Sequence, residues 1–125
     1  MKGGLGMEWD LDKNRPICPQ ICEQLCIKIA SGELQPNTRL LSVRETAVVA
    51  GVNPNTVQKS FGELERLGLV YSVRGTGWFV SENTEAAKET VKNIIQKKTG
   101  EYFKEMGKLG FSADEVKNYI KEWNI

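Results

Sequence analysis

The stretch GVNPNTVQKSFGELERLGLVYSVRGTGWFV, residues 51–80, decides the fold. Its first third combines glycine, asparagine and proline, which are residues that open a helix. Asn53 can cap the helix, and Pro54 fits the first helical position, where a missing N–H costs nothing. The pattern predicts a helix from Pro54 to about Leu67, which Gly68 then ends.

The remainder of this stretch predicts a β-hairpin. Residues 69–73 are rich in β-branched and aromatic types, which indicate a strand. The sequence RGTG, residues 74–77, forms a turn, and residues 78–80 return as a second strand. A helix followed at once by a hairpin is typical of a helix-turn-helix domain with a β-wing.

Upstream of this stretch, the apolar residues recur at helical spacing and predict a first helix that ends near Ser31. Pro16 and Pro19 fit its first turn. A turn around Pro36 then leads to a short extended piece, residues 38–41.

A second short helix is expected just before residue 51. Ser42 and Glu45 have the S-x-x-E spacing of a capping box, and Gly51 breaks the helix that they begin. Residues 15–80 therefore run helix, short strand, helix, turn, helix, hairpin. The expected fold class is mainly α with a small β-wing (α+β), a winged helix-turn-helix domain followed by a two-helix extension.

The composition changes after residue 81. Residues 84–106 predict a long amphipathic helix, and Gly107 and Gly110 interrupt the chain after it. Ser112 and Glu115 form a second capping box. A stripe at i, i+3, i+4 and i+7 on the short last helix consists of Val116, Tyr119, Ile120 and Trp123.

These patterns divide the chain into three parts. Residues 1–13 are glycine-rich at the start and are expected to be a flexible leader. Residues 14–80 form the winged helix-turn-helix domain, and residues 81–125 form a helical dimerisation tail.

Composition excludes several classes of protein. The 125 residues carry a net charge of +1 and no histidine, so the commonest general base and zinc ligand is missing. The sequence has neither clustered carboxylates nor a phosphate-binding loop, so an enzyme is not expected, and neither is a cofactor or a metal. Without a secretory signal or an apolar run long enough to cross a membrane, the chain is expected in the cytoplasm.

Three cysteines form an i, i+4, i+8 row on one helix face, at Cys18, Cys22 and Cys26. A thiolate metal site or a redox site is conceivable there. The odd count and the lack of a CxxC pair or a fourth ligand favour cysteines that pack as small hydrophobic residues.

The third predicted helix has two distinct faces. With about 100° per residue, Val57, Phe61 and Leu64 cluster on the core side. The opposite face carries Asn55, Lys59, Gly62 and Arg66, with Gln58 beside them and Thr56 on the other shoulder.

The polar residues at the start of this helix suit DNA. Asn and Gln can bond adenine bidentately in the major groove, and Thr can meet a base or a thymine methyl. Free N–H groups at the helix start would suit a phosphate. The alternative is that Asn53 and Thr56 only cap the helix, while Gln58 and Lys59 are ordinary solvated residues.

Two further features favour DNA binding. The basic, glycine-rich hairpin tip around Arg74 and Gly75 can approach a narrow groove closely, although glycines also suit any plain turn. Arg44 begins the second helix, which crosses the DNA backbone in helix-turn-helix docking. Its alternative role is a surface ion pair with a nearby glutamate.

Six motifs occur in order over about residues 14–80, and they resemble the winged-helix domain of the GntR family of bacterial transcription regulators. Only about 45 residues follow the wing, which is similar to the YtrA subfamily, whose short tail is two helices used for dimerisation. The motifs are Pro16-Ile17…Gln20-Ile21, Ala30-Ser31-Gly32-Glu33-Leu34, Leu41-Ser42-Val43-Arg44-Glu45, Gly51-Val52-Asn53-Pro54-Asn55-Thr56-Val57, Leu64-Glu65…Leu67-Gly68-Leu69-Val70 and Arg74-Gly75-Thr76-Gly77…Phe79-Val80.

This resemblance implies which residues contact DNA, and Lys59 is added because it lies on the same outward face. The chain departs from the family pattern at Gly62, where a larger, often basic residue is usual, at Asn37 and Leu41, and at the bulky Trp78. The implied contacts are Arg44, Asn53, Asn55, Thr56, Gln58, Arg74, Gly75 and Thr76.

The tail supplies a reason to dimerise. A short amphipathic helix pair cannot bury its own apolar stripe, whereas two tails can pair, unless the tail packs back on its own winged domain. The residues expected at the dimer interface are Val91, Ile94, Ile95, Tyr102, Ile120 and Trp123.

The sequence therefore predicts a homodimeric repressor that binds a two-fold DNA operator. The subfamily resemblance implies a link to a transporter operon. A winged-helix module that binds another protein is the alternative, and the near-neutral charge permits it. The sequence does not indicate the operator, the target genes or a small-molecule effector.

Overall fold

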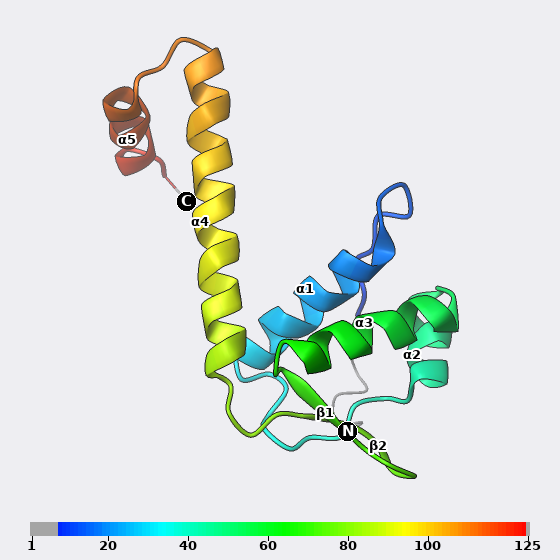
Figure 1. The fold of residues 1–125 in the computed structure, drawn as a ribbon. Coiled ribbons are helices and arrows are strands. Elements are labelled where there is room, and N and C mark those ends of the chain that lie inside the picture. The colour runs from blue at the N-terminus through cyan, green and yellow to red at the C-terminus, as the bar shows by residue number, and fades with distance from the viewer. Residues whose placement is uncertain (1–7, 125) are drawn as a thin grey trace. The chain divides into compact units, whose positions relative to one another are not determined.

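The structure is a computed structural model that describes residues 8–124 and shows five helices and a two-stranded sheet among them (Figure 1). This composition confirms the predicted winged-helix class. The chain divides into two compact units, one that ends at Val91 and one that begins at Lys92. The elements are α1 (Ile17–Ala30), α2 (Val43–Ala50), α3 (Pro54–Arg66), β1 (Val70–Val73), β2 (Gly77–Val80), α4 (Glu85–Lys108) and α5 (Ala113–Lys121).

The core of the first unit forms around α3, which contacts α1, α2 and β1. The apolar periodicity of α1 and α3 places their buried residues on the faces that meet. The buried core residues are Ile21, Leu25, Cys26, Ile29, Leu34, Leu40, Ala47, Val57, Phe61, Leu64, Leu69, Val70, Val80 and Ala87.

Both predicted starts of the helix-turn-helix are confirmed in detail. The Ser42 hydroxyl accepts a bond from Glu45 N–H at 3.0 Å, and the Glu45 carboxylate accepts one from Ser42 N–H at 3.1 Å, which completes the capping box of α2. Asn53 caps α3, with Pro54 in its first turn. The Asn53 cap, together with Gly51 in the left-handed conformation (φ 69°), defines the turn that separates α2 from α3.

The hairpin β1–β2 is antiparallel and forms the wing, whose tip extends away from the helices of the first unit in Figure 1. The short extended piece predicted at residues 38–41 pairs with the other edge of β2. Leu40 N–H donates to Trp78 O at 2.8 Å, Val80 N–H donates to Thr38 O at 2.9 Å, and Arg39 forms a bridge with Phe79. The wing is therefore held along both edges of β2.

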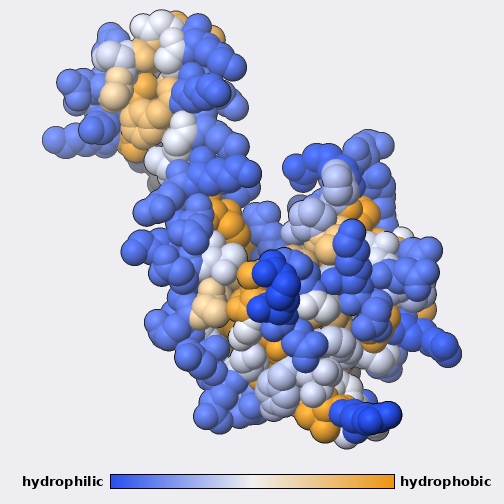
Figure 2. Space-filling model, in the orientation of Figure 1, coloured by the Kyte–Doolittle hydropathy of each residue, from blue (hydrophilic) through white to orange (hydrophobic). Residues whose placement is uncertain are grey.

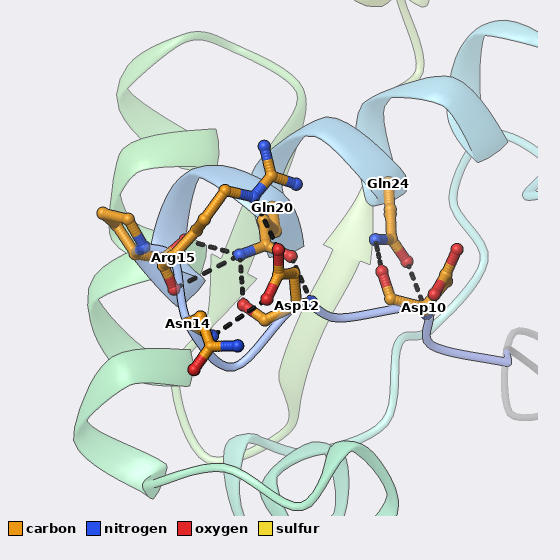
Figure 3. A network of polar contacts seen from close by, with 7 residues as sticks. Asp10, Asp12, Asn14, Arg15, Gln20 and Gln24 are labelled. Atoms are coloured by element: carbon orange, nitrogen blue, oxygen red, sulfur yellow. Dashed lines mark hydrogen bonds and ion pairs between the residues drawn. The ribbon is translucent and has the colours of Figure 1, made fainter.

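The segment before α1 differs from the expected flexible leader. Residues 1–7 lie outside the described part of the chain, but Trp9 and Leu11 pack partly buried against the core. Between them, the backbone of Asp10 pairs with the side-chain amide of Gln24, through bonds of 3.2 and 2.6 Å (Figure 3). We call residues 8–15 the strap.

A second glutamine one turn earlier on α1 holds the strap in the same way. Gln20 accepts a bond from Asp12 N–H at 2.7 Å and donates to Asp12 O at 3.0 Å (Figure 3). Gln20 and Gln24 lie on one helix face and bond alternate strap residues, much as a neighbouring strand would. The strap is therefore ordered by α1, and its apolar side chains can point into the core.

The second unit contains the remainder of α4 and all of α5. Gly107 lies inside α4, which ends at Lys108, and Ser112 and Glu115 form the predicted capping box of α5. Val116 is buried, 1% exposed, whereas most other apolar side chains of α5 stay exposed. Among the helices of the described residues, none has both the length and the apolar character needed to cross a membrane.

Candidate nucleic-acid interface

The buried face of α3 fixes which side chains it presents to solvent. Val57, Phe61 and Leu64 are all at most 1% exposed, as the helical spacing predicted. Their burial turns the opposite side outward. On that side Asn55, Gln58 and Lys59 are exposed, and Thr56 is half-buried.

The outward amides of α3 are not used by the protein itself. Within the described part of the chain, the side chains of Asn55 and Gln58 make no hydrogen bond. An exposed amide offers both a donor and an acceptor, which is the combination that adenine requires in the major groove. These two side chains are available to an external partner.

The start of α3 offers fewer donors than expected. Pro54 has no N–H, Asn55 N–H is bonded to Asn53 Oδ1 at 2.8 Å, and Thr56 N–H donates to Asn53 O at 3.0 Å. Asn53 thus accepts the N–H groups of Asn55 and Thr56, so fewer donors are free at this end than expected. Any attraction for a phosphate here depends mainly on the helix dipole.

The wing presents the predicted residues at its tip. Arg74, Gly75 and Thr76 are all exposed, and Thr76 N–H closes the turn by donating to Val73 O at 2.9 Å. The Arg74 side chain forms no ion pair or hydrogen bond with any residue between 8 and 124. Its charge therefore faces solvent.

The root of the wing is packed directly on α3. Trp78 meets Phe61 edge-on, with ring centroids 5.5 Å apart and planes at 69°. Ser72 donates from both its N–H and its hydroxyl to the Glu65 carboxylate, at 3.3 and 3.0 Å. These contacts explain the bulky residue at position 78 and hold the wing in a fixed position relative to the outward face of α3.

Arg44 is exposed in the first turn of α2. The alternative of an ion pair with a nearby glutamate is not seen among the residues that the structure describes. Glu45 instead accepts the Ser42 N–H, which is the main cause that lowers the pKa of its carboxyl group. Arg44, the outward face at the start of α3 (Asn55, Thr56, Gln58 and Lys59) and the wing thus form the candidate interface, all within the first unit.

Comparison with known proteins identifies the family. Residues 19–80 match the family described as bacterial regulatory proteins, gntR family. The chain is also 36% identical over 115 residues to the uncharacterized HTH-type transcriptional regulator YhcF of Bacillus subtilis, covering 92% of this chain and 95% of that protein. The chain belongs to the GntR family.

The predicted resemblance to short-tailed members is confirmed by a second relative. The HTH-type transcriptional repressor YtrA of Bacillus subtilis is 34% identical over 117 residues, which cover 90% of this GntR-family chain and 88% of the repressor.

Two solved structures agree with this assignment. A GntR family transcriptional regulator from Listeria monocytogenes is 32% identical with a TM-score of 0.80, covering 91% of this chain and all of that chain. AraR(DBD) in complex with operator ORX1 is 29% identical with a TM-score of 0.51, over 60% of this chain and 92% of that chain.

In this GntR-family chain, two cations that the sequence analysis missed lie near the helix-turn-helix and the wing. Lys13 lies in the strap, and its ammonium donates to Gly51 O at 2.7 Å and to Ala50 O at 3.3 Å, at the turn between α2 and α3. Arg39 lies in the extended piece beside the wing. The alternation of Trp9 and Leu11 could have indicated the strap, but no sequence signal marks either cation.

Cys26 packs in the core and Cys22 packs against it, as the favoured interpretation stated, whereas Cys18 is half-buried. Cys26 is buried and its thiol donates to Ala87 O at 3.4 Å, while Cys22 is half-buried and donates to Ser60 O at 3.5 Å. Burial raises the pKa of both thiols, that of Cys22 to about 12. Neutral, packed thiols are poor metal ligands, and no metal-binding cluster occurs among the described residues.

Proposed function

We propose that this GntR-family transcription regulator is a homodimeric repressor that reads a two-fold DNA operator. The observation that carries the proposal is the unpaired polar face of α3, held beside the wing by the contact between Trp78 and Phe61. A regulator of bacterial DNA would act in the cytoplasm. The similarity to the repressor YtrA supports repression, and control of a transporter operon is part of the proposal.

Within this proposal the residues divide into two groups by chemistry. Asn55, Thr56 and Gln58 would read base edges, because their side chains can both donate and accept. Asn53 would contribute only its amide N–H groups, since its Oδ1 is used by the cap of α3. The cations Arg44, Lys59 and Arg74, with the close-approaching backbone of Gly75 and the hydroxyl of Thr76, would hold the phosphates, and the cations would set the salt dependence.

The second unit supplies the surface for dimerisation. It holds an open apolar groove of about 620 Å³, lined by Tyr102, Met106, Leu109, Phe111, Val116, Tyr119, Ile120 and Trp123. Figure 2 shows apolar surface on this unit with hydrophilic side chains around it.

Three of the expected interface residues are strongly exposed in the described chain. They are Ile95 at 58%, Ile120 at 46% and Trp123 at 59%, whereas Ile94 and Tyr102 are half-buried. Val91 packs partly against the core of the first unit, so less of it is available to a partner. Pairing two copies would place two α3 helices on half-sites about one helical turn, roughly 34 Å, apart.

The test uses fluorescence anisotropy with the duplex upstream of the protein's own gene and an unrelated duplex. Arg74→Ala should weaken binding to both, while Asn55→Ala should lower selectivity at one base position by about 1–3 kcal/mol. Arg66→Ala is the matched control, because Arg66 is exposed on α3 but bonded to Glu63.

The proposal fails if the wild-type protein binds both duplexes equally, or if neither variant changes binding. Binding that is insensitive to salt would instead support the alternative, a winged-helix module that grips another protein.

A further inference from the structure

Building on the proposed function, we propose that Arg39 is a further phosphate ligand, located between the wing and the first turn of α2. Arg39 belongs neither to α3 nor to the wing tip. It lies in the extended piece that bridges to Phe79 of β2.

The guanidinium lies against the root of the wing. A Cβ placed on Gly77 would be 3.3 Å from Arg39 Nε and 3.7 Å from Nη2. The φ of Gly77 is 136°, a conformation that side chains rarely adopt. The glycine therefore leaves room for the arginine, which is positioned by the wing rather than by a partner charge.

Arg39 also lies close to the start of α2, three residues before its cap, Ser42. The pKa of the Glu45 carboxyl is lowered mainly by its bond from Ser42 and also by the positive charge of Arg39. Glu45 nevertheless forms no ion pair with Arg39, and its oxygen accepts the Ser42 N–H at 3.1 Å. Arg39 is thus close to α2 and not neutralised by it.

The five arginines of the chain separate into two sets. Arg15 is bonded to Asp12 and Arg66 to Glu63. The side chains of the other three make no ion pair or hydrogen bond with any residue in 8–124. These arginines lie at the start of α2, at the wing tip and in the extended piece beside β2. This unpaired set is Arg44, Arg74 and Arg39.

An exposed, unpaired guanidinium suits a phosphate. Its fork of donors matches phosphate oxygens bidentately, and it is less strongly hydrated than an ammonium. The DNA backbone that runs from the wing to α2 in helix-turn-helix docking would pass this position.

The experiment measures the binding of wild type, Arg39→Gln, Arg39→Lys and Arg66→Gln to the promoter duplex and to an unrelated duplex, between 50 and 200 mM salt. Arg39→Gln should weaken binding to both duplexes by a similar factor, about tenfold at low salt. The slope of log affinity against log salt should fall by about 0.9, the value for one phosphate. Arg39→Lys should keep the wild-type slope, because it keeps the charge, and Arg66→Gln should change neither quantity.

Wild-type affinity and slope in Arg39→Gln would overturn the proposal. A loss confined to the promoter duplex would also do so, since it would indicate base reading. If Arg39→Gln does not fold, Arg39→Lys provides the test instead. Because this variant keeps the charge, a phosphate contact made through charge should keep the wild-type salt slope, and a reduced slope would contradict the proposal. Equal binding of the wild type to both duplexes would instead refute the proposed function itself.

Discussion

At the scale of single residues, Cys22 links α1 to α3. Its thiol donates to Ser60 O on α3 at 3.5 Å. Burial is the main cause that raises its pKa from 9.0 to about 12, and Cys18 adds to the effect. An unfolded chain would expose this thiol and return its pKa toward the ordinary value.

This shift predicts a loss of stability in alkali. Above pH 9 the unfolded chain releases the Cys22 proton while the folded chain keeps it, so the free energy of unfolding falls as pH rises from about 9 to about 12. Urea denaturation at pH 8 and pH 10 should show a smaller loss in Cys22→Ala than in the wild type. Equal losses in the two proteins would contradict the shift.

The sequence shows which residues of α3 point outward but not which are available. The 3.6-residue period alone puts Val57 inside and Asn55 outside. The loss of the free N–H groups depends on how Asn53 folds over the helix start, and the place of Arg39 depends on its pairing with Phe79. Both are set by contacts that a local pattern does not contain.

At the scale of elements, α3 contains a glycine in its interior and is followed by another. A Cβ on Gly62 or on Gly68 would meet no atom within 4 Å, so neither site is limited by space. They differ in backbone, because Gly68 has a φ of 82° and Gly62 is helical.

The same substitution should therefore have opposite effects at the two sites. Gly62→Ala should raise the free energy of unfolding by about 0.5–1 kcal/mol, because alanine loses less entropy in a helix. Gly68→Ala should lower it by about 1–2 kcal/mol, because the left-handed conformation strains a Cβ. Urea denaturation checks both, and changes of the same sign would refute the explanation.

The helices and the hairpin could be predicted because their caps, glycines and periods are local. The strap could not be predicted, because its order comes from hydrogen bonds to Gln20 and Gln24 of the following helix. In the sequence these two glutamines look like ordinary solvated residues. Only the alternation of Trp9 and Leu11 with Asp10 and Asp12 carried a signal, and it spans just four residues.

At the scale of the whole molecule, the second unit is where the proposed dimer would form. Ile120 lines the apolar groove and is 46% exposed. A lysine there would place a charge where two copies are proposed to meet, which is costly without a partner.

Ile120→Lys should therefore give a monomer. Sedimentation velocity should show the wild type at twice the 14.0 kDa chain mass and the variant at the chain mass. Asn118→Lys is the control, because position 118 adds the same charge on α5 but does not line the groove. A monomeric wild type, or a variant that still forms dimers, would rule out this interface.

The three tryptophans provide an optical consequence of this architecture. Trp9 lies in the strap, Trp78 at the wing root against Phe61, and Trp123 in the exposed groove of the second unit. The strap, the wing and the proposed dimer surface thus each carry one tryptophan, and the chain contains no other tryptophan. Variants that keep one tryptophan at a time would report strap release, DNA docking and subunit pairing as separate emission signals, without any added dye.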